Sequence, residues 1–475
     1  MIAIPITASK ANEAIKDIRE ASGMADLIEL RLDLIKDINE NNLKKLLANK
    51  KKKIIVTDRK NRLNLIKKAI GLKADFVDLD LSIGEKAIKK IINNKQNTKI
   101  IISSHNFKKT SEKEINDKFE KIKKLNPNII KIVAFANSIN DNLIIFDLIK
   151  KSIKQRKKII AFCMGEKGEI SRILSPLLGS FLTFASLKKG KESAPGQIEA
   201  GILKNVYRVN KLKGKNAKIF GLVGNPVKHS KGFLVHNKAF DKLNLNSIYL
   251  NFLVDDLESF IENFKGMISG LSITIPFKRE IMKYADEIDP AAKGIGAVNT
   301  ILNIKGKLIG CNTDCIAAIK AIKEKTQIKN KKVVIIGAGG AARAIAYGIK
   351  EEKGELVILN RTVSKAEKLA KELSCEYGPL DKIGEIKNIS LLINATSIGM
   401  WPNISESPVK NNKLLKGMVV FDTVYNPQET RLLKDAKANG CKTISGTEMF
   451  INQAAAQFEL FTGKKAPISI MREAL

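Results

Sequence analysis

Short apolar runs alternate with longer amphipathic segments through about the first 210 residues of the chain. The runs are rich in Ile and Val and have the length of buried parallel strands. The segments between them repeat their apolar residues at helical spacing, as in ANEAIKDIREAS, which ends at Gly23. Another begins at Ser111, where Glu114 has capping-box spacing. Strands are expected at 2–6, 26–33, 53–59, 75–81, 99–105, 128–135, 158–164 and 181–187.

Eight strand and helix pairs close a parallel sheet on itself, so this pattern predicts a (β/α)8 TIM barrel rather than an open sheet. In such barrels the functional side chains gather at the C-terminal ends of the strands and in the loops that follow. Polar residues occupy these positions in the sequence: Glu29, Arg31, Arg59, His105, Arg172, Ser193 and Gln197.

Lys131 stands inside the expected strand NIIKIVAF, with apolar neighbours on both sides. A strand lysine more often reaches solvent, and a histidine at a strand end more often bonds only to backbone. If Lys131 is buried, low dielectric disfavours its ammonium form and leaves a neutral amine that forms a Schiff base with a ketone. His105, one strand away, would then move a proton from the neighbouring carbon to a leaving hydroxyl group, which is a β-elimination.

A second α/β pattern follows the polar, basic stretch at 210–217. Its strongest signal is KKVVIIGAGGAARAIAYGI at 331–349, an apolar strand that runs into a glycine turn and a helix. This matches the dinucleotide fingerprint G-x-G-x-x-[GA], in which a pyrophosphate approaches backbone amides at a helix N-terminus. The predicted phosphate loop comprises Gly337, Ala338, Gly339, Gly340 and Ala341, with Ala342 at the last motif position.

The next expected strand indicates which dinucleotide would bind. An acidic residue at its end would bind the ribose hydroxyls of NAD, but ELVILNRTVSK has Asn360, Arg361, Thr362 and Lys365 there. A guanidinium at this turn matches a 2′-phosphate, so the predicted cofactor is NADP(H). The alternative is that Arg361 is only a solvated loop charge.

Residues 218–320 carry the candidate reacting groups, in GLVGNPVKHSKGFLVHN, GLSITIPFK, GAVNTI and GCNTD. Reduction of a ketone by hydride leaves an alkoxide that must be protonated, and an ammonium held by a carboxylate does this near neutral pH. Lys278 and Asp314 are the candidates. Either residue alone would more often be a surface charge.

Composition restricts the partners and the compartment. The formal net charge is +34, which is compatible with nucleic acid, an anionic membrane or small acidic substrates. The lysines are spread along the whole chain and aromatic residues make up only 5%, so we expect small-molecule substrates and no nucleic acid. We expect a cytoplasmic protein, because the five cysteines are sparse and the sequence has no export signal. We expect neither a membrane span, since no long apolar stretch is present, nor a metal site. Most of the excess of lysine has no functional explanation.

The motifs IELRLD, SSHNF, IIKIVAF, EKGEISRILSPLLGS and SAPGQ, in this order, resemble type I 3-dehydroquinate dehydratase over residues 1–209. The resemblance implies that Lys131 forms the imine and that His105 shuttles the proton. It also implies that the substrate carboxylate and ring are held by Arg172, Ser193 and Gln197, and the hydroxyl groups by Glu29, Arg31 and Arg59.

One departure from that family concerns the histidine. The family usually has a glutamate shortly after the strand-three arginine, and that glutamate orients the histidine; here TDRKNRLNLIKK has Leu63 at about that place. Asp78 or Asp80, at the end of strand four, would have to supply the carboxylate, and our hypothesis is Asp80. A barrel that has lost its activity is the rival interpretation.

Residues 218–475 resemble shikimate dehydrogenase, through the strings above and through NATSIGMWP, VFDTVYNP and GTEMFINQAAAQFELFTG. The resemblance implies Lys278 and Asp314 as the catalytic pair and Gly446 as part of the cofactor site. Ser272 replaces the Asn of many members, and Gly232 replaces a second carboxylate-binding serine, which would admit quinate as a second substrate. His229 and His236 are interpreted as structural. The implied substrate residues are Ser230, Thr274, Asn299, Asn312, Tyr425 and Gln453.

The two resemblances together predict a fusion that catalyses consecutive steps, from dehydroquinate to dehydroshikimate to shikimate, like the bifunctional enzymes of plants and some bacteria. The alternative is an active shikimate/quinate dehydrogenase fused to a weakly active or inactive barrel. The expected domains are a barrel at 1–209, a linker at 210–217, a substrate lobe at 218–325 onto which helices at 450–475 pack back, and a Rossmann lobe at 326–449.

Overall fold

The computed structural model describes residues 1–475, apart from the side chain of Lys215. The chain folds into two compact units, one formed by 1–218 and 246–263 and the other by 219–245 and 264–475.

The first unit contains eight parallel strands in the order β7-β6-β5-β4-β3-β2-β1-β8. Pairing of β8 with β1 makes this a nearly closed barrel, which confirms the predicted fold. Each strand lies within its predicted range, but β8 keeps only two residues as regular strand. The strands are β1 (Ile2–Ile6), β2 (Leu27–Arg31), β3 (Lys53–Thr57), β4 (Phe76–Asp80), β5 (Lys99–His105), β6 (Ile129–Phe135), β7 (Ile159–Met164) and β8 (Thr183–Phe184).

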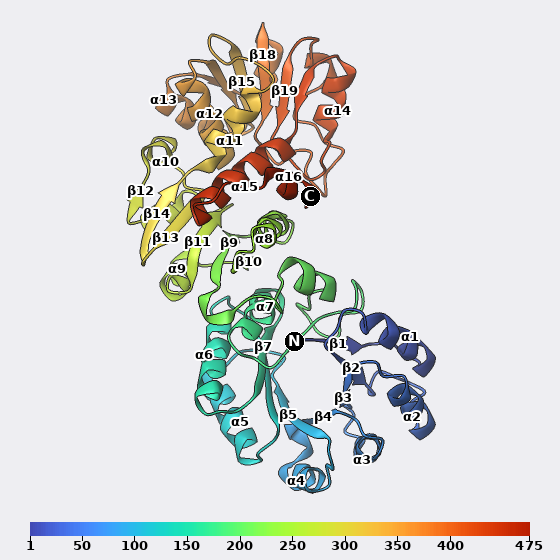
Figure 1. Ribbon diagram of the computed structural model, residues 1–475. Helices are drawn as coiled ribbons and strands as arrows, with labels where there is room; N and C mark the ends of the chain where they lie inside the picture. The colour runs from blue at the N-terminus through green and yellow to red at the C-terminus, as the bar shows by residue number, and fades with distance from the viewer. The chain divides into compact units, whose positions relative to one another are not determined.

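Helices α1 to α7 surround these strands (Figure 1). Ser111 caps the fifth helix as predicted, because its side chain accepts a hydrogen bond from the backbone N–H of Glu114. Strand register pairs Asp80 with Ser103 and Ser103 with Lys131, so these three residues lie at the same level of the barrel. The helices are α1 (Ala11–Ala21), α2 (Glu40–Ala48), α3 (Leu63–Gly71), α4 (Glu85–Asn93), α5 (Glu112–Lys124), α6 (Asp141–Lys154) and α7 (Glu169–Leu177).

A mixed six-stranded sheet follows, in the order β10-β9-β11-β13-β14-β12. Strand β13 is antiparallel to both of its neighbours. Its strands are β9 (Lys218–Gly224), β10 (Ser247–Leu253), β11 (Ile268–Ile273), β12 (Glu287–Ile288), β13 (Thr300–Ile304) and β14 (Lys307–Cys311), and the helices of this region are α8 (Gly232–Lys242), α9 (Leu257–Phe264), α10 (Pro290–Ile295) and α11 (Thr313–Lys323).

The third sheet is parallel and has the order β17-β16-β15-β18-β19-β20. This is the doubly wound order of a Rossmann fold, with the change of direction between β15 and β18, as predicted. Helices α11, α12 and α13 cover one face and α14 the other (Figure 1). The elements are β15 (Lys332–Ile336), α12 (Gly340–Glu351), β16 (Glu355–Leu359), α13 (Val363–Leu373), β17 (Glu376–Gly378), β18 (Ile389–Asn394), β19 (Val419–Asp422), α14 (Arg431–Ala438) and β20 (Lys442–Ile444), followed by α15 (Gly446–Thr462) and α16 (Ile468–Glu473).

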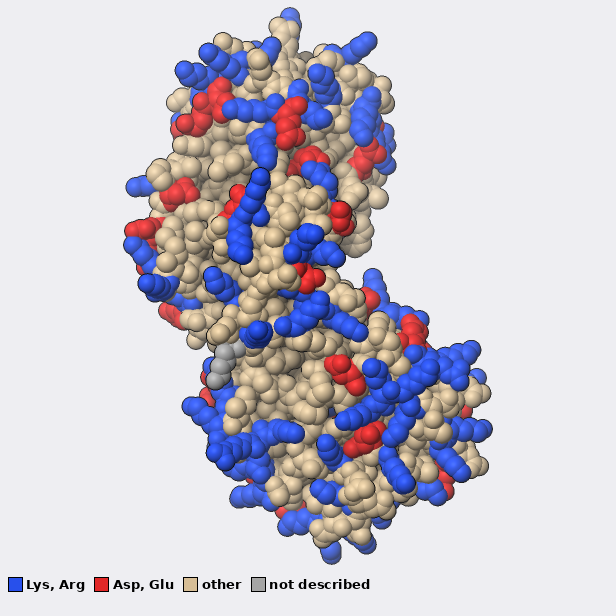
Figure 2. Space-filling model, viewed as in Figure 1, with Lys and Arg blue, Asp and Glu red and all other residues tan. Residues whose placement is uncertain are grey.

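Lys and Arg side chains are scattered over the visible face of each unit, with Asp and Glu among them (Figure 2). All five cysteines are free thiols. Among the described residues, no helix has both the length and the apolar character needed to cross a bilayer, and no cluster of three or more His, Cys, Asp or Glu is arranged to hold a metal ion.

Candidate active sites

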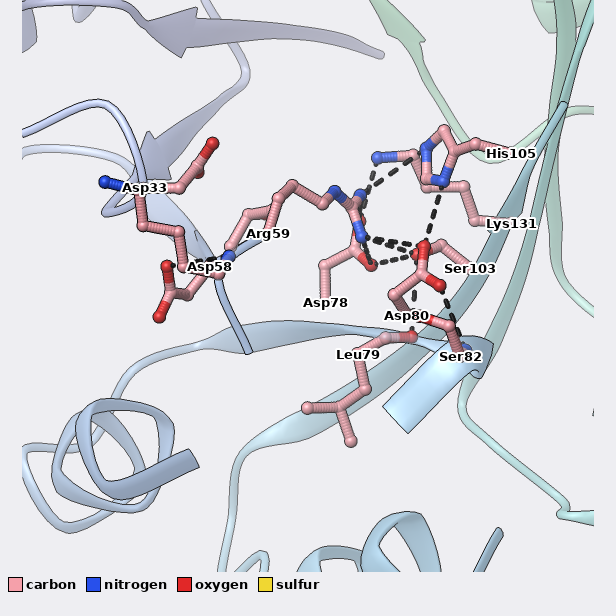
Figure 3. A network of polar contacts seen from close by, with 12 residues as sticks. Asp33, Asp58, Arg59, Asp78, Leu79, Asp80, Ser82, Ser103, His105 and Lys131 are labelled. Atoms are coloured by element: carbon pink, nitrogen blue, oxygen red, sulfur yellow. Dashed lines mark hydrogen bonds and ion pairs between the residues drawn. The ribbon is translucent and has the colours of Figure 1, made fainter. Parts of the chain in front are cut away.

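The mouth of the barrel gathers charged side chains from the C-terminal halves of neighbouring strands (Figure 3). Lys131 on β6 is only 4% exposed, so it is the buried amine and not the solvent-reaching lysine. Its Nζ lies 2.8 Å from Asp78 Oδ2, 3.6 Å from Glu29 Oε1 and 4.3 Å from the centre of the Phe184 ring. The apolar neighbours of Lys131 in sequence do not reveal these two carboxylates, because other strands contribute them. A lysine paired in this way must give up a proton before it attacks a carbonyl carbon.

Asp78 is the most enclosed carboxylate of this group, with a fully buried side chain. Ser103 Oγ donates to its Oδ1 at 2.5 Å, and Arg59 Nη2 donates to its Oδ2 at 3.0 Å. Burial alone would raise the pKa of Asp78, but the charges of Arg59, Lys131 and His105 outweigh it and hold that pKa far below the usual range. Asp78 therefore stays ionised at neutral and at mildly acidic pH.

His105, at the end of β5, has a carboxylate partner. Its Nδ1 lies 3.3 Å from Asp80 Oδ2, and its Nε2 lies 3.4 Å from Arg59 Nη2. Burial lowers the pKa of His105, the hydrogen bond with Asp80 acts against this, and the positive charges of Arg59 and Lys131 lower it further. Burial would raise the pKa of Asp80, but its hydrogen bonds with His105 and Ser82 lower that pKa to about 2. Of the two carboxylates that the sequence left open, Asp80 contacts the histidine and Asp78 contacts the lysine (Figure 3).

Arg172 on α7 is fully buried, and burial lowers its pKa to about 10. Its Nη2 donates to the carbonyl of Pro195 at 3.0 Å, and its guanidinium lies 4.5 Å from the centre of the Phe162 ring. Its Nε and Nη1 have no hydrogen-bond partner among the described residues. Two buried, unpaired N–H groups on one guanidinium suit an anionic ligand such as a carboxylate.

The other predicted barrel residues have partners within the protein. The backbone N–H and the Oγ of Ser193 both donate to Gln197 Oε1, at 2.7 and 3.3 Å, in the loop that also supplies Pro195. Thr57 Oγ1 donates to Glu29 Oε1 at 2.9 Å. Arg31 makes two hydrogen bonds to Asp33, at 3.0 and 2.7 Å.

In the second unit, Lys278 and Asp314 form a direct pair, with Nζ 2.5 Å from Oδ2. Asp314 lies in the first turn of α11, where the side chain of Asn312 caps the helix by accepting from the N–H of Asp314. Lys278 also lies close to the first turn of α12, because a Cβ added at Gly340 would stand 3.0 Å from Lys278 Cδ. The pair therefore lies close to the N-terminus of α12, the helix that follows the glycine motif.

Two groups of predicted substrate residues lie in this unit. Asn299 Nδ2 and Gln453 Nε2 donate to Thr313 Oγ1, at 3.0 and 3.3 Å, directly beside Asp314. Tyr425 lies beside Ser230, which acts against the rise that burial causes in the pKa of Tyr425, and its ring stacks on Phe450 with centroids 4.6 Å apart. The backbone N–H of Thr274, just after β11, bonds to Val223 O.

The residues of the predicted dinucleotide site fit a phosphate group. Gly337 has φ +118°, and a Cβ there would lie 2.9 Å from the carbonyl of Ala395, so only glycine fits. Gly339 directly precedes α12, and a Cβ built there would meet nothing within 4 Å, so there is open space at the N-terminus of this helix. At the end of β16, Asn360 Nδ2 bonds to Thr362 O, whereas Arg361 and Lys365 are exposed and have no carboxylate partner among the described residues. Gly446 abuts the loop after β19, since a Cβ there would lie 2.4 Å from Val424 O.

Several residues that build these sites were not singled out from the sequence. Ser103 and Thr57 hold Asp78 and Glu29, and the two-residue spacing of Ser103 and His105 was a readable signal that both face the same side of β5. Gln457, one helical turn after Gln453, is buried: its Oε1 accepts from Ser272 Oγ at 2.7 Å and its Nε2 donates to Thr300 Oγ1 at 2.8 Å.

Family models match both halves of the chain. A model described as type I 3-dehydroquinase matches residues 2–213. Models described as the shikimate dehydrogenase substrate binding domain, shikimate / quinate 5-dehydrogenase and the shikimate 5'-dehydrogenase C-terminal domain match residues 222–301, 319–427 and 446–475.

Whole proteins match in the same way. A chloroplastic bifunctional 3-dehydroquinate dehydratase/shikimate dehydrogenase of Arabidopsis thaliana is 37% identical over 98% of this chain and 83% of its own length. An NADP(+) shikimate dehydrogenase of Methanocaldococcus jannaschii is 46% identical over 54% of this chain and 96% of its own length. A crystal structure of a shikimate dehydrogenase in complex with NADP+ superposes with a TM-score of 0.52 at 45% identity, over 54% of this chain and 94% of that one.

Proposed function

The chain belongs to the family of bifunctional 3-dehydroquinate dehydratase/shikimate dehydrogenases, and on that premise we propose how its residues carry out the two reactions. It combines a lyase and an oxidoreductase of the shikimate pathway in one polypeptide. The proposed functional parts are the dehydratase barrel (1–209), the linker (210–217), the substrate lobe (218–325, joined by 450–475) and the cofactor lobe (326–449).

In the barrel, Lys131 attacks the ketone of 3-dehydroquinate and forms an imine, and His105 moves the proton from the neighbouring carbon to the departing hydroxyl. The observation that carries this proposal is the buried Lys131, whose Nζ is connected to His105 through two residues. Asp78 accepts from Nζ at 2.8 Å, and Arg59 bonds to Asp78 at 3.0 Å and approaches the His105 ring at 3.4 Å. Arg172, with its two unpaired N–H groups, would receive the substrate carboxylate.

Reductive trapping tests this assignment. The full chain is mixed with 3-dehydroquinate and borohydride, and peptides are mapped by mass spectrometry. We expect one adduct, on Lys131, and none in Lys131→Ala. An adduct on another residue, or no adduct in the wild type, would refute the imine mechanism.

In the second half, Lys278 and Asp314 supply the proton that the reduced carbonyl oxygen of 3-dehydroshikimate takes up. NADPH, when bound, supplies the hydride; the glycines at 337–340 would hold its pyrophosphate, and Arg361 and Lys365 its 2′-phosphate. The support is the 2.5 Å pair of Lys278 and Asp314 beside Gly340. Lys278→Met is expected to abolish NADP+-dependent shikimate oxidation while NADPH still binds, as followed by nicotinamide fluorescence, and retained turnover would contradict the assignment.

Free thiols at all five cysteines are compatible with a reducing compartment, and we propose the cytoplasm. The Arabidopsis relative is described as chloroplastic, which concerns that protein. Fractionation of cells that produce the protein, with each activity assayed per fraction, tests the compartment.

A further inference from the structure

We propose that Asp78 is a third catalytic residue of the barrel: it is the permanent counter-ion of the nitrogen on Lys131 and keeps the imine on that nitrogen protonated. This inference rests on the proposed imine chemistry of Lys131. It gives separate tasks to the two carboxylates of β4, since Asp80 lies against His105 instead.

The contact is direct, and further side chains bond to the same carboxylate (Figure 3). Asp78 Oδ2 lies 2.8 Å from Lys131 Nζ, the atom that would bond to substrate. Ser103 Oγ holds the other oxygen at 2.5 Å, and Arg59 Nη2 holds Oδ2 at 3.0 Å. The carboxylate projects from the middle of a barrel strand and its side chain is fully buried, so it cannot turn away from the amine or exchange it for water.

Asp78 is unsuited to act as a base. Arg59, Lys131 and Ser103 already use its lone pairs, and a carboxylate that stays ionised does not retain a proton taken from substrate. Its remaining chemical role is electrostatic. Glu29, the other carboxylate near Lys131, is farther away at 3.6 Å and accepts from Thr57.

The reaction needs a negative charge beside Nζ while the protonated imine exists. A bond forms between Nζ and the carbonyl carbon, and the carbonyl oxygen leaves as water, which produces an imine with a positively charged nitrogen. This cation accepts the electron pair of the neighbouring C–H bond when His105 takes the proton. The hydroxyl group then leaves as water with that proton, and a second water hydrolyses the imine and frees Lys131. An unprotonated imine is a poor electron acceptor, so elimination stops at the pH at which the imine loses its proton.

The experiment compares four full-length proteins: wild type, Asp78→Asn, Asp78→Glu and Ser103→Ala. Each is incubated with 3-dehydroquinate and cyanoborohydride, which reduces protonated imines, and the adduct on Lys131 is quantified by mass from pH 5 to pH 9. Removal of an opposite charge at this distance is expected to lower the midpoint pH of trapping by about 1–3 units in Asp78→Asn. Ser103→Ala and Asp78→Glu keep the charge and are expected to stay near the wild-type midpoint. NADP+-dependent shikimate oxidation by the same chains reports on folding of the second half, and circular dichroism reports on the whole chain.

The outcomes separate the two proposals. If the wild type forms no adduct, the imine mechanism itself fails. If the wild type forms the adduct and Asp78→Asn has the same midpoint, the imine mechanism stands and the role of Asp78 is overturned. If Asp78→Asn does not fold, Asp78→Glu decides, because a midpoint lowered despite the retained charge contradicts the proposal and an unchanged midpoint supports it.

Discussion

Asp80 is the residue whose replacement tests most directly how the barrel manages without the usual glutamate. The change Asp80→Asn keeps the size of the side chain and removes its charge. In the structure Asp80 Oδ2 faces His105 Nδ1, and Oδ1 accepts from the backbone N–H of Ser82. The amide can keep the contact with Ser82, so the contacts of the charged Oδ2 are lost: the one to His105 at 3.3 Å and a longer one to Arg59 Nη1 at 3.5 Å.

The distance gives the size of the effect. A hydrogen bond to a charged group contributes about 1.5–3 kcal/mol, and the strongest of them are about 2.7–2.9 Å long. The contact between His105 and Asp80 is 3.3 Å long, which places it at the weaker end. A loss of about 1.5 kcal/mol corresponds to a roughly tenfold fall in kcat/KM for dehydration.

The pH profile of dehydration gives a second, independent test of the role of Asp80. The hydrogen bond that His105 donates to Asp80 raises the pKa of His105 against the effect of burial, so its removal lowers that pKa. Because His105 must be neutral to accept a proton, the acidic limb of the dehydration profile should move to lower pH in Asp80→Asn.

The assay follows formation of the conjugated product by its ultraviolet absorbance from pH 5 to pH 9. Shikimate oxidation by the same chain is the internal control, since Asp80 is remote in sequence from every residue of that site. Asp80→Asn/Leu63→Glu tests rescue, because it returns a carboxylate to the position where the family usually has one. An unchanged rate together with an unchanged acidic limb would show that Asp80 does not orient His105.

Three further changes test the second half of the chain. Gly232→Ser should raise the ratio of kcat/KM for shikimate over quinate by about 10- to 100-fold, because the serine side chain fills the space near C1 that the extra hydroxyl of quinate needs, and an equal ratio in both proteins removes any role for Gly232. Arg361→Gln should raise KM for NADPH by about 10- to 100-fold and leave NADH use unchanged, whereas a parallel loss with both cofactors would mean that Arg361 does not contact the 2′-phosphate. Burial raises the pKa of Asp422 from 3.8 to about 6, so its share of stability is fully present below about pH 4 and is lost as the pH rises through 6, about 3 kcal/mol in all. Asp422→Asn should flatten this part of the unfolding free energy measured from pH 4 to pH 8, and an unaltered slope would assign it to other groups.

The fold was readable from the sequence because its signals are local. Apolar runs of strand length, glycine turns and a capping serine lie within a few residues of one another, and every barrel strand was predicted within its range. The exception is β8, where an apolar run at 181–187 forms only Thr183–Phe184 as regular strand. Its neighbour Ser186 bridges to Glu199 instead, a partner outside the strands, which no local pattern reveals.

The sites were only half readable, because their electrostatics depend on residues far apart in the chain. Lys131 and His105 could be chosen as candidate catalytic residues from their positions in the strands. The apolar neighbours of Lys131 in sequence gave no sign of Asp78, which lies 53 positions earlier. Pairing of β4 with β5 and of β5 with β6 brings these strands side by side, with Asp80, Ser103 and Lys131 in register. Asp78, two residues before Asp80, faces the same side of β4 and reaches Lys131 from there. Gln457 was missed for the same reason, since its partners Ser272 and Thr300 precede it by 185 and 157 residues.

The same register explains how the barrel accommodates Leu63. Leu63 is the first residue of α3, and the loop before it is held by Arg62, which bonds to Asp58 and to the carbonyl of Leu32. That loop is therefore held without a carboxylate on the histidine, and its Arg59 approaches the His105 ring instead. The carboxylate beside His105 comes instead from β4, whose alternate residues face the same side of the sheet, so the strand that supplies Asp78 to Lys131 must also present Asp80 at the next level of the mouth. A partner fixed to a barrel strand is at least as well positioned as one on a loop, so loss of the usual glutamate does not by itself indicate an inactive dehydratase.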